Sequence, residues 1–564
     1  MESEFLLESR FVGGLPLVNS ILNRIGVDEM LMMALPAGSR LHHARALGVL
    51  LRNIVLNDRQ PIYTHQEWAR RVECSLVGLE PGQEELLNDD RVGRALDRLF
   101  EADRAALLTD VVVRTIRLFE VDLAQLHNDS TTLTLAGEYR AANGHEVDGK
   151  PTLSVTYGHN KDHRPDLKQL LFVLTVSADG AVPIHYNALD GNIEDSTTHV
   201  ATWETLRKLT GRSDFLYVAD CKLCTSTAMS HIDVEKGRFI TVLPGSRRED
   251  AWFKRYLETH DPPWEEAIRR RNVRRRQCQE DIWKVVEAPL PSKEGYRVIW
   301  VWNSSKAERD AGARQSRIEK AWLGLERLQA RLHGKRCRFT FRSTVGAEAR
   351  KIITECGAER WVGFKVSESR EPVFRQADRG RPGGKTLYLR RHRVRFSVDT
   401  RKLDDAILAD ARSDGVFPLI TNCRDLSAKQ VLEAYKFQPK LEKRHEQIKT
   451  VQHLAPVWLK KVTRIESLLF LYFLALLVHA LLEREIRQGM ARNGIKHIPL
   501  YPEERECGAP STERILDVFA PLQRHRLRSG NNLVKVFEPE LNSLQQQITH
   551  LLRLPDDAFR LPLC

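Results

Sequence analysis

The sequence predicts an α/β protein: a mixed-sheet core that carries an inserted α+β domain and an N-terminal helical domain. Three features of the pattern predict this class. Apolar residues recur at helical spacing through residues 1–118. Short apolar or alternating runs, broken by Asp-Gly turns, fill residues 119–224 and are typical of strands. Over residues 225–400, apolar runs alternate with arginine-rich stretches, and helical spacing then returns.

The expected elements follow in chain order. In the core we expect strands at residues 121–127, 152–157, 170–177, 182–189 and 215–219, with a helix at 198–209. In the insertion we expect strands at 240–243, 298–302 and 386–395 and a long charged helix at 305–333. The chain thus divides into a helical N-terminal domain (1–118), a first core segment (119–224), a basic β-rich insertion (225–400), a second core segment (401–490) and a helical C-terminal tail (491–564).

The composition is that of a large globular protein with a basic surplus. The 564 residues suggest two to four domains at ~150 residues each. Hydrophobic residues make up 42% of the chain, which excludes a mostly disordered protein. Lys and Arg number 87 against 75 Asp and Glu, a net charge of +12. This surplus favours a polyanionic partner.

Compartment and membrane contact are predicted from the cysteines and one apolar run. The nine cysteines are odd in number and scattered, which does not fit a disulfide framework. The run at residues 468–482 is shorter than the ~20 residues of a membrane span and has charged flanks, so we interpret it as a buried core helix. The N-terminus lacks the pattern of a secretory signal. We expect a cytoplasmic protein with no membrane contact.

Two aspartates follow predicted strands. Asp129 comes just after the strand at 121–127, and Asp220 ends the strand at 215–219. The carboxyl ends of strands are where α/β sheets bind ligands. If the two strands are neighbours, the carboxylates lie side by side, which is costly unless a hard cation lies between them. The alternative for either residue alone is an Asp that caps the following turn.

A third acid belongs to a spaced polar pattern. Measured at 100° per residue, Tyr435, Gln438, Glu442 and Lys449 share a stripe about 60° wide on a helix. Pro439 interrupts this helix: either the helix begins there, with the proline in its first turn, or it bends. The alternative interpretation of the stripe is a solvated amphipathic face.

These residues together resemble a known family. The blocks that carry the resemblance are HNDSTT at 127–132, GHNKDHRPDLKQ at 158–169, DGN at 190–192, VAD at 218–220, DGVFPLITN at 414–422 and the Y-x2-Q-x3-E-x6-K pattern that starts at Tyr435. They resemble the DDE transposases of bacterial insertion sequences, in the group with a Y-x2-R-x3-E-x6-K signature (the IS-four-like superfamily, IS-sixteen-thirty-four-like branch). The resemblance runs from about residue 10 to 490. Gln438 stands where the signature has arginine.

The resemblance implies a function and a site. It identifies Asp129, Asp220 and Glu442 as the catalytic and metal-binding triad on an RNase H-like core, with the β-rich insertion between the second and third acids. It implies two Mg²⁺ ions, replaceable by Mn²⁺, that support cleavage at the ends of the protein's own insertion sequence and joining of the 3′-hydroxyl ends to target DNA. The implied partners are double-stranded DNA (terminal inverted repeats and target) and a second copy in a synaptic homodimer, in the bacterial nucleoid.

The basic side chains are expected to contact DNA phosphates. We expect this of Lys161, Arg164, Arg269, Arg270, Arg271, Arg274, Arg275, Arg276, Arg390 and Arg391, and of Tyr435, Gln438 and Lys449 from the signature. The N-terminal helices are expected to bind the element's ends. Two alternatives stay open for the whole protein: a catalytically inactive DNA-binding relative, and an RNase H-fold nuclease without strand transfer. For the arginine runs, the alternative is a solvated surface.

Overall fold

The computed structural model describes residues 5–38, 40–57, 59–158, 161, 164–271, 280–334, 337–451, 459–530 and 532–560. The chain forms two compact units, the first made of Met1–Thr241 and Glu433–Cys564 and the second of Val242–Leu432. The second unit begins later than the insertion predicted at residue 225. The reason is that α8 (Ser226–Val234) leads into β8 (Arg238–Val242), which pairs in parallel with β7 (Leu216–Ala219) and so continues the first unit.

A large mixed sheet confirms the predicted α/β class. Its nine strands follow the order β6-β5-β2-β7-β8-β14-β11-β10-β9. In the first unit, β6 (Pro183–Asp190), β5 (Lys168–Ser177) and β2 (Gln125–Leu135) are antiparallel, and β7 and β8 continue from β2 in parallel. In the second unit, β14 (Val416–Thr421), β11 (Arg297–Asn303), β10 (Glu280–Glu287) and β9 (Glu265–Arg271) are antiparallel.

Most core elements agree with the sequence prediction. The strands expected at 170–177, 182–189 and 215–219 are β5, β6 and β7, and the helix expected at 198–209 is α7 (His199–Thr210). The strand expected at 121–127 instead continues to Leu135, because its polar residues are paired inside the sheet: the Asn128 amide donates to Thr175 Oγ1 at 2.9 Å. The strand expected at 152–157 is wrong. The short strands β3 (Glu146–Val147) and β4 (Lys150–Pro151) precede it, and only isolated bridges follow.

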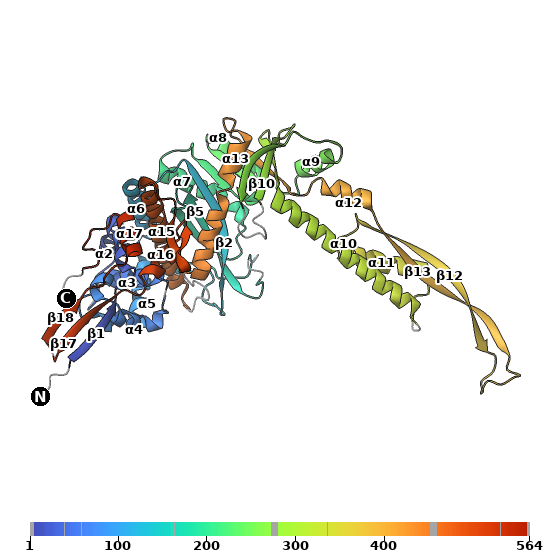
Figure 1. Ribbon diagram of the computed structural model, residues 1–564, viewed down its shortest axis with the longest axis horizontal. Helices are drawn as coiled ribbons and strands as arrows, with labels where there is room; N and C mark the ends of the chain where they lie inside the picture. Colours follow the sequence, from blue (N-terminus) through green and yellow to red (C-terminus); the bar gives the residue numbers. More distant parts are fainter. Residues whose placement is uncertain are drawn as a thin grey trace. The chain divides into compact units, whose positions relative to one another are not determined.

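Several helices of the first unit pack against one long apolar helix, α15 (Val462–Arg492) (Figure 1). The N-terminal helices are α1 (Leu15–Ile25), α2 (Val27–Ala34), α3 (His43–Val55), α4 (His65–Arg71), α5 (Asp89–Glu101) and α6 (Arg104–Phe119), of which α1, α3 and α5 contact α15. By length and composition α15 is apolar enough to cross a membrane, but its most apolar stretch is wholly buried within the protein. The prediction of a buried core helix is therefore confirmed.

The two ends of the chain meet in a small sheet. β1 (Phe5–Phe11) pairs with β17 (Gln523–Ser529), which pairs with β18 (Asn532–Phe537). The C-terminal part also contains β15 (Ile498–Tyr501), β16 (Arg505–Cys507), α16 (Thr512–Phe519) and α17 (Ser543–Leu551), so the prediction of a purely helical tail is wrong. Charge pairing hides the strand pattern: buried Arg526 donates to buried Glu73 at 2.7 Å.

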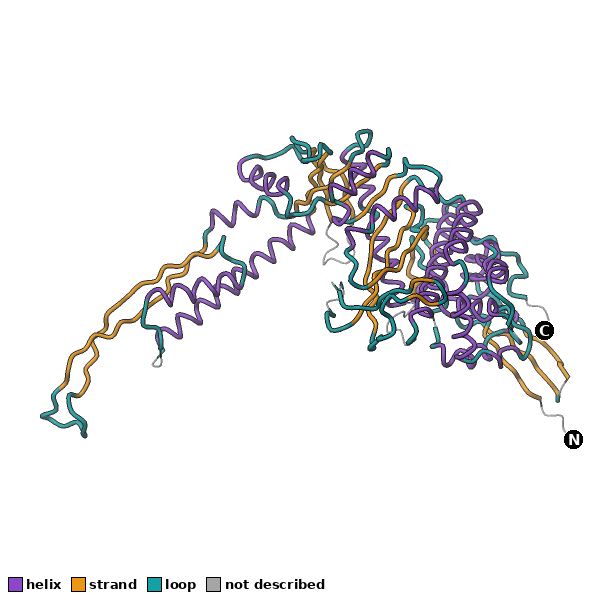
Figure 2. The backbone as a smooth tube through the Cα atoms, turned by 180° about the vertical axis from the view of Figure 1, so that it is seen from behind, coloured by secondary structure: helices purple, strands orange, loops and turns teal. Residues whose placement is uncertain are grey.

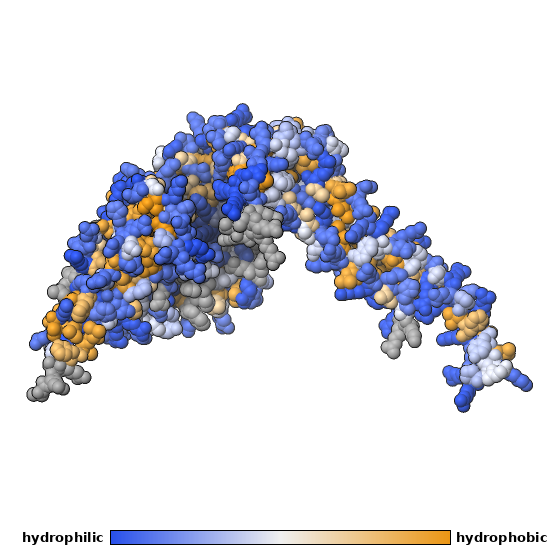
Figure 3. Space-filling view, viewed as in Figure 1, coloured by the Kyte–Doolittle hydropathy of each residue, from blue (hydrophilic) through white to orange (hydrophobic). Residues whose placement is uncertain are grey.

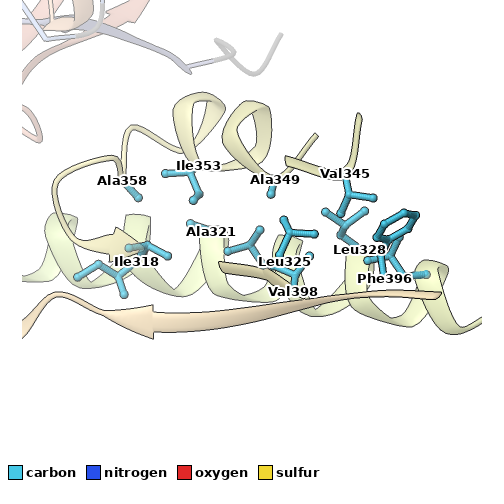
Figure 4. Packing of buried hydrophobic residues seen from close by; sticks show 13 residues of the cluster. Ile318, Ala321, Leu325, Leu328, Val345, Ala349, Ile353, Ala358, Phe396 and Val398 are labelled. Atoms are coloured by element: carbon cyan, nitrogen blue, oxygen red, sulfur yellow. The ribbon is translucent and has the colours of Figure 1, made fainter. Parts of the chain in front are cut away.

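The second unit contains a long β-hairpin supported by two helices. β12 (Val362–Gln376) and β13 (Tyr388–Lys402) pair over fifteen residues each. The predicted charged helix is α10 (Ser304–His333), and α11 (Arg342–Glu355) lies beside it. A stripe of apolar residues on α10 packs against α11 and one face of the hairpin, as Figure 4 shows for Leu328, Val345 and Phe396. The unit also contains α9 (Arg248–Thr259) and α12 (Asp404–Ala411).

Candidate active site

Two carboxylates lie next to each other on adjacent parallel strands: Asp220 directly follows β7, as predicted, whereas Asp129 lies within β2 and not after it, because this strand continues to Leu135. Asn128 of β2 lies opposite Ala219 of β7, and each of these two residues is followed directly by one of the acids, Asp129 or Asp220. The strands β2 and β7 are therefore neighbours, which was the condition for the two carboxylates to lie side by side. Asp129 Oδ1 accepts a hydrogen bond from the Ser130 N–H at 2.8 Å, and Asp220 Oδ1 accepts one from the Lys222 N–H at 3.0 Å.

The third acid lies on a short helix that starts at the proline. α13 (Ala428–Tyr435) ends before the interruption, and α14 (Gln438–Glu446) begins with Pro439 in its first turn, so the first alternative for this residue is confirmed. The helix then continues as a π-helical turn, Gln447–Val451. All four residues of the spaced pattern, together with Asp129 and Asp220, line one open cavity of about 490 Å³. The acids therefore face a common space.

Gln438 fixes α14 onto β2 beside the first acid. Its side chain is only 5% exposed. Its Oε1 accepts from His127 Nδ1 at 2.9 Å, and its Nε2 donates to the Asn128 carbonyl at 3.1 Å. Burial lowers the pKa of His127 to about 4, so this imidazole is neutral. The amide of Gln438 is thus used within the protein, and a DNA contact by this side chain stays a prediction.

The electrostatics of the cavity disfavour unneutralised carboxylates. The pKa of Asp129 is raised to about 7, mainly by burial and to a smaller extent by the nearby Asp220 and Glu442 carboxylates, while the Lys161 ammonium opposes the shift. Burial likewise raises the pKa of Asp220 and that of the Tyr435 hydroxyl. A perturbed acid in a cavity is a mark of functional sites. The cavity therefore favours either protons or a bound cation.

Lys161 supplies a positive charge beside these acids. Its Nζ lies 2.9 Å from Asp195 Oδ2 and 4.0 Å from Asp129 Oδ1, and it donates to the Ser130 carbonyl at 2.6 Å and to Ser130 Oγ at 2.8 Å. Asp195 is a fourth carboxylate that the sequence prediction did not assign to the site. It follows the DGN block by three residues, and that spacing is the signal that could have identified it.

The DGN turn is held against the segment that precedes Lys161. A side chain at Gly191 would place its Cβ 2.1 Å from the Gln169 carbonyl oxygen, so only glycine fits this position. The Gln169 amide in turn donates to the Gly191 carbonyl at 2.7 Å. The equivalent atom at Gly158 would lie 2.0 Å from the Gly191 oxygen. Gly158 and Gln169 of the first block therefore pack closely against Gly191 of the DGN block.

His445 is a site residue that sequence reasoning missed. Its Nδ1 lies 3.7 Å from Asp129 Oδ2, and its side chain is 8% exposed. Burial, aided by the positive charges of Lys161 and Lys449, lowers its pKa to about 3, so the imidazole is neutral. Its Nε2 is buried and has no hydrogen-bond partner among the described residues. The signal in the sequence is its position three residues after Glu442, which places both on neighbouring parts of one helix.

The donor chemistry fits a divalent cation. Carboxylate oxygens are the ligands that Mg²⁺ prefers, and the raised pKa of Asp129 shows that its anion lacks sufficient compensation here. Across the described ranges, however, no three His, Cys, Asp or Glu side chains close around a single metal position. The Glu442 side chain is exposed on the cavity wall. Binding of one or two Mg²⁺ ions by the three acids stays a prediction.

Three of the remaining predicted DNA contacts of the first unit line this cavity, and Arg164 is not among its lining residues. Tyr435 and Lys449 line it, as does Lys161. Arg164 is exposed and makes a bidentate ion pair with Asp166, at 2.7 and 2.8 Å. A phosphate contact by Arg164 would therefore compete with this pair.

The arginines of the second unit differ in how strongly they are neutralised. Arg269 on β9 is held by Glu266 and Glu280, with contacts of 2.7–2.8 Å. Arg270 and Arg271 are exposed on the same strand, and Arg390 and Arg391 are exposed on β13. The predicted contacts at Arg274, Arg275 and Arg276 lie outside the described residues.

Comparison with known proteins reaches only the N-terminal part of the chain. Residues 7–113, from β1 into α6, match a family described as a domain of unknown function (DUF4277). No curated protein matches the chain. The segment that matches ends before the first acid, so the interpretation of the cavity rests on its own geometry.

Proposed function

We propose that this chain is a DNA transposase of the DDE type, built on an RNase H-like core. The observation that carries the proposal is that Asp129, Asp220 and Glu442, from two parallel strands and a separate helix, line one cavity in which burial and the two neighbouring carboxylates raise the pKa of Asp129. The antiparallel strands β6, β5 and β2, extended in parallel by β7 and β8, support the RNase H-like interpretation of the core.

The side chains of the cavity would divide the work. Asp129, Asp220 and Glu442 would hold two Mg²⁺ ions, or Mn²⁺ in their place. When bound, these ions neutralise the carboxylates and polarise the phosphodiester that is cleaved. Gln438 positions the helix that carries Glu442. Lys161 is close enough to the acids to contact a non-bridging phosphate oxygen that enters the cavity.

The reaction would be two in-line displacements at phosphorus. In the first, water attacks the phosphodiester at the element's end, the P–O3′ bond breaks, and a 3′-hydroxyl and a 5′-phosphate are released. In the second, that 3′-oxygen attacks a phosphodiester of target DNA, forms a new P–O bond and displaces the target's own 3′-hydroxyl. Bonds of the same kind are exchanged in the second step, so it needs no external energy source and no covalent protein intermediate.

The proposed partners follow from this reaction. The substrate is double-stranded DNA that carries the element's terminal inverted repeats, and the second substrate is target DNA. Two ends must be brought together, so the active assembly is proposed to be a homodimer in the bacterial cytoplasm. The N-terminal helices are proposed to bind the ends.

The test is an excision and integration assay with the DNA that flanks the gene. A selectable marker is placed between the two flanking segments, and release of the marker and its insertion elsewhere are measured. Asp129→Asn, Asp220→Asn and Glu442→Gln should each abolish release while end binding is retained. Glu433→Gln, an exposed acid on α13 away from the cavity, is the matched control and should behave as wild type.

Three outcomes would contradict the proposal. Wild-type release by any acid variant would remove that residue from the site. Binding of the ends without any cleavage by the wild-type protein would indicate an inactive DNA-binding relative. Cleavage without insertion would indicate a nuclease that does not perform strand transfer.

A further inference from the structure

The outer part of the hairpin in the second unit is a ribbon with no covering element. We call residues 369–395 the distal ribbon: eight opposed pairs, from Ser369 and Arg395 to Gln376 and Tyr388, and the turn that joins them. The buried cluster formed with α10 and α11 reaches no further along the hairpin than Phe396. Beyond it, all paired residues except Gln376 and Arg395 are exposed, and Figure 2 shows that the two strands extend past the ends of both helices. At about 3.4 Å per residue, this paired part is about 27 Å long.

The distal ribbon has a high net positive charge for its length. It has nine Lys or Arg residues and two Asp or Glu residues, a net charge of +7, against +12 for the whole chain. Figure 3 shows its surface as mainly hydrophilic, with small hydrophobic areas. Among the described residues, ion pairs of the ribbon arginines are found at Arg370 with Glu368 (3.9 Å) and at Arg395 with Glu371 (2.7 Å). Arg390, Arg391 and Arg393 form no ion pair with any residue that the structure describes.

The arginines occur on both faces of the ribbon. Residues directly opposite each other in an antiparallel pair share a face. Arg390, opposite Phe374, lies on the face that continues the buried side of the hairpin, whereas Arg391, opposite Val373, and Arg393 lie on the other face. A flat protein surface would neutralise one of these faces only. A partner with negative charge on two sides would neutralise both.

We infer that the distal ribbon binds double-stranded DNA by lying in its major groove. The major groove, about 12 Å wide, admits a two-stranded ribbon, and its walls present phosphates on both sides. A ribbon about 27 Å long covers about eight base pairs at 3.4 Å each. The inference deepens the proposed function and rests on it only in taking DNA as the substrate.

The main experiment removes three arginines from one strand. The variant Arg390→Gln, Arg391→Gln, Arg393→Gln is compared with wild type by fluorescence anisotropy on a labelled 40-base-pair duplex of arbitrary sequence, between about 50 and 200 mM salt. We expect binding to weaken by about tenfold or more at low salt. We also expect the slope of log affinity against log salt to become shallower by about 2.7, since each lost phosphate contact accounts for about 0.9.

The matched control removes the same charge elsewhere in the same unit. Arg317, Lys320 and Arg327 are exposed on α10, and their triple Gln variant should bind with nearly the wild-type slope. A second variant joins Glu368 to Phe396 through Asn-Gly in place of the ribbon. These two residues lie opposite each other, so a two-residue hairpin turn closes the shortened ribbon. It should lose the same part of the DNA affinity while keeping the circular dichroism of a folded chain.

The outcomes separate this inference from its alternatives. If the arginine variant and the shortened variant keep the wild-type affinity and slope, the ribbon does not bind DNA and its charges only keep an exposed ribbon soluble. If shortening instead lowers the sedimentation mass and leaves DNA affinity unchanged, the ribbon is a contact between protein copies. Repeating the binding with Asp129→Asn separates the two proposals: ribbon-dependent binding should persist there, and would stand even if the wild-type protein cut no DNA.

Discussion

Asp129→Asn should stabilise the metal-free protein at alkaline pH while it abolishes cleavage. The fold raises the pKa of this carboxyl from 3.8 to about 7, mainly by burial. The folded protein therefore binds a proton here more tightly than the unfolded chain does. The resulting stability is fully present below about pH 4 and is lost as the pH rises through about 7. The amide of Asn does not ionise and avoids that loss.

The size of the effect can be bounded from the structure. A shift of about three pKa units corresponds to at most about 4 kcal/mol, at 1.36 kcal/mol per unit. The side chain is 19% exposed, and the Lys161 ammonium lies 4.0 Å away and is close enough to respond to the charge. Water and this ammonium reduce the penalty, so we expect about 1–3 kcal/mol between pH 5 and pH 8. Asn can still accept the hydrogen bond from Ser130.

The assay is thermal unfolding in EDTA at pH 5 and at pH 8, for wild type and variant. The wild-type protein should lose about 1–3 kcal/mol more stability than the variant over this interval. Addition of Mg²⁺ at pH 8 should raise the melting temperature of the wild type and much less that of the variant. Asp110→Asn, an exposed acid on α6, is the control. Identical pH profiles for wild type and Asp129→Asn would refute the reasoning.

Three further substitutions test the surroundings of the acids. Lys161→Gln removes the charge that opposes the shift, so the pKa of Asp129 should rise and the pH at which cleavage reaches half its maximum should increase; an unchanged profile would exclude this role. Gln438→Leu leaves its two partners on β2 unpaired and should cost about 1–3 kcal/mol of stability as well as cleavage rate; a wild-type melting temperature would contradict this. Arg444→Met removes the shorter ion pair of Glu483 (2.9 Å, each side chain 4% exposed) and leaves the one with Arg487 at 3.4 Å, so it should cost about 3 kcal/mol in urea unfolding, whereas exposed Lys443→Met should be near neutral.

The spacing of apolar residues was sufficient to predict those helices and strands whose own residues follow a regular pattern. β5 and α10 were predicted within two residues because a buried strand and a long helix each impose a regular pattern on their own residues. β17 was missed because Arg524 and Arg526 are buried in it and neutralised by Glu538 and Glu73, which come from other parts of the chain. A strand whose inward residues are charged has no apolar alternation to detect.

The acids of the candidate site could be predicted from the sequence, but the contacts that Lys161 and His445 make with them could not. Asp129 and Asp220 lie within or directly after recognisable strands, so their proximity was expected on the condition that the two strands are neighbours. The ammonium of Lys161 reaches Asp129 and Asp195 from a separate segment of the chain. The approach of His445 to Asp129 depends on how α14 lies on β2. These contacts arise from tertiary packing, which residue spacing along the chain does not record.

Because the first unit is discontinuous, its cavity is completed late during translation. The ribosome makes Asp129 and Asp220 before Thr241, and the helix with Glu442 emerges only after the whole second unit. At about 5–20 residues per second, the nearly 200 intervening residues take about 10–40 s to synthesise. During that interval the nascent polypeptide holds two of its three acids. A message broken anywhere in this stretch would therefore yield a product that lacks the complete set of acids.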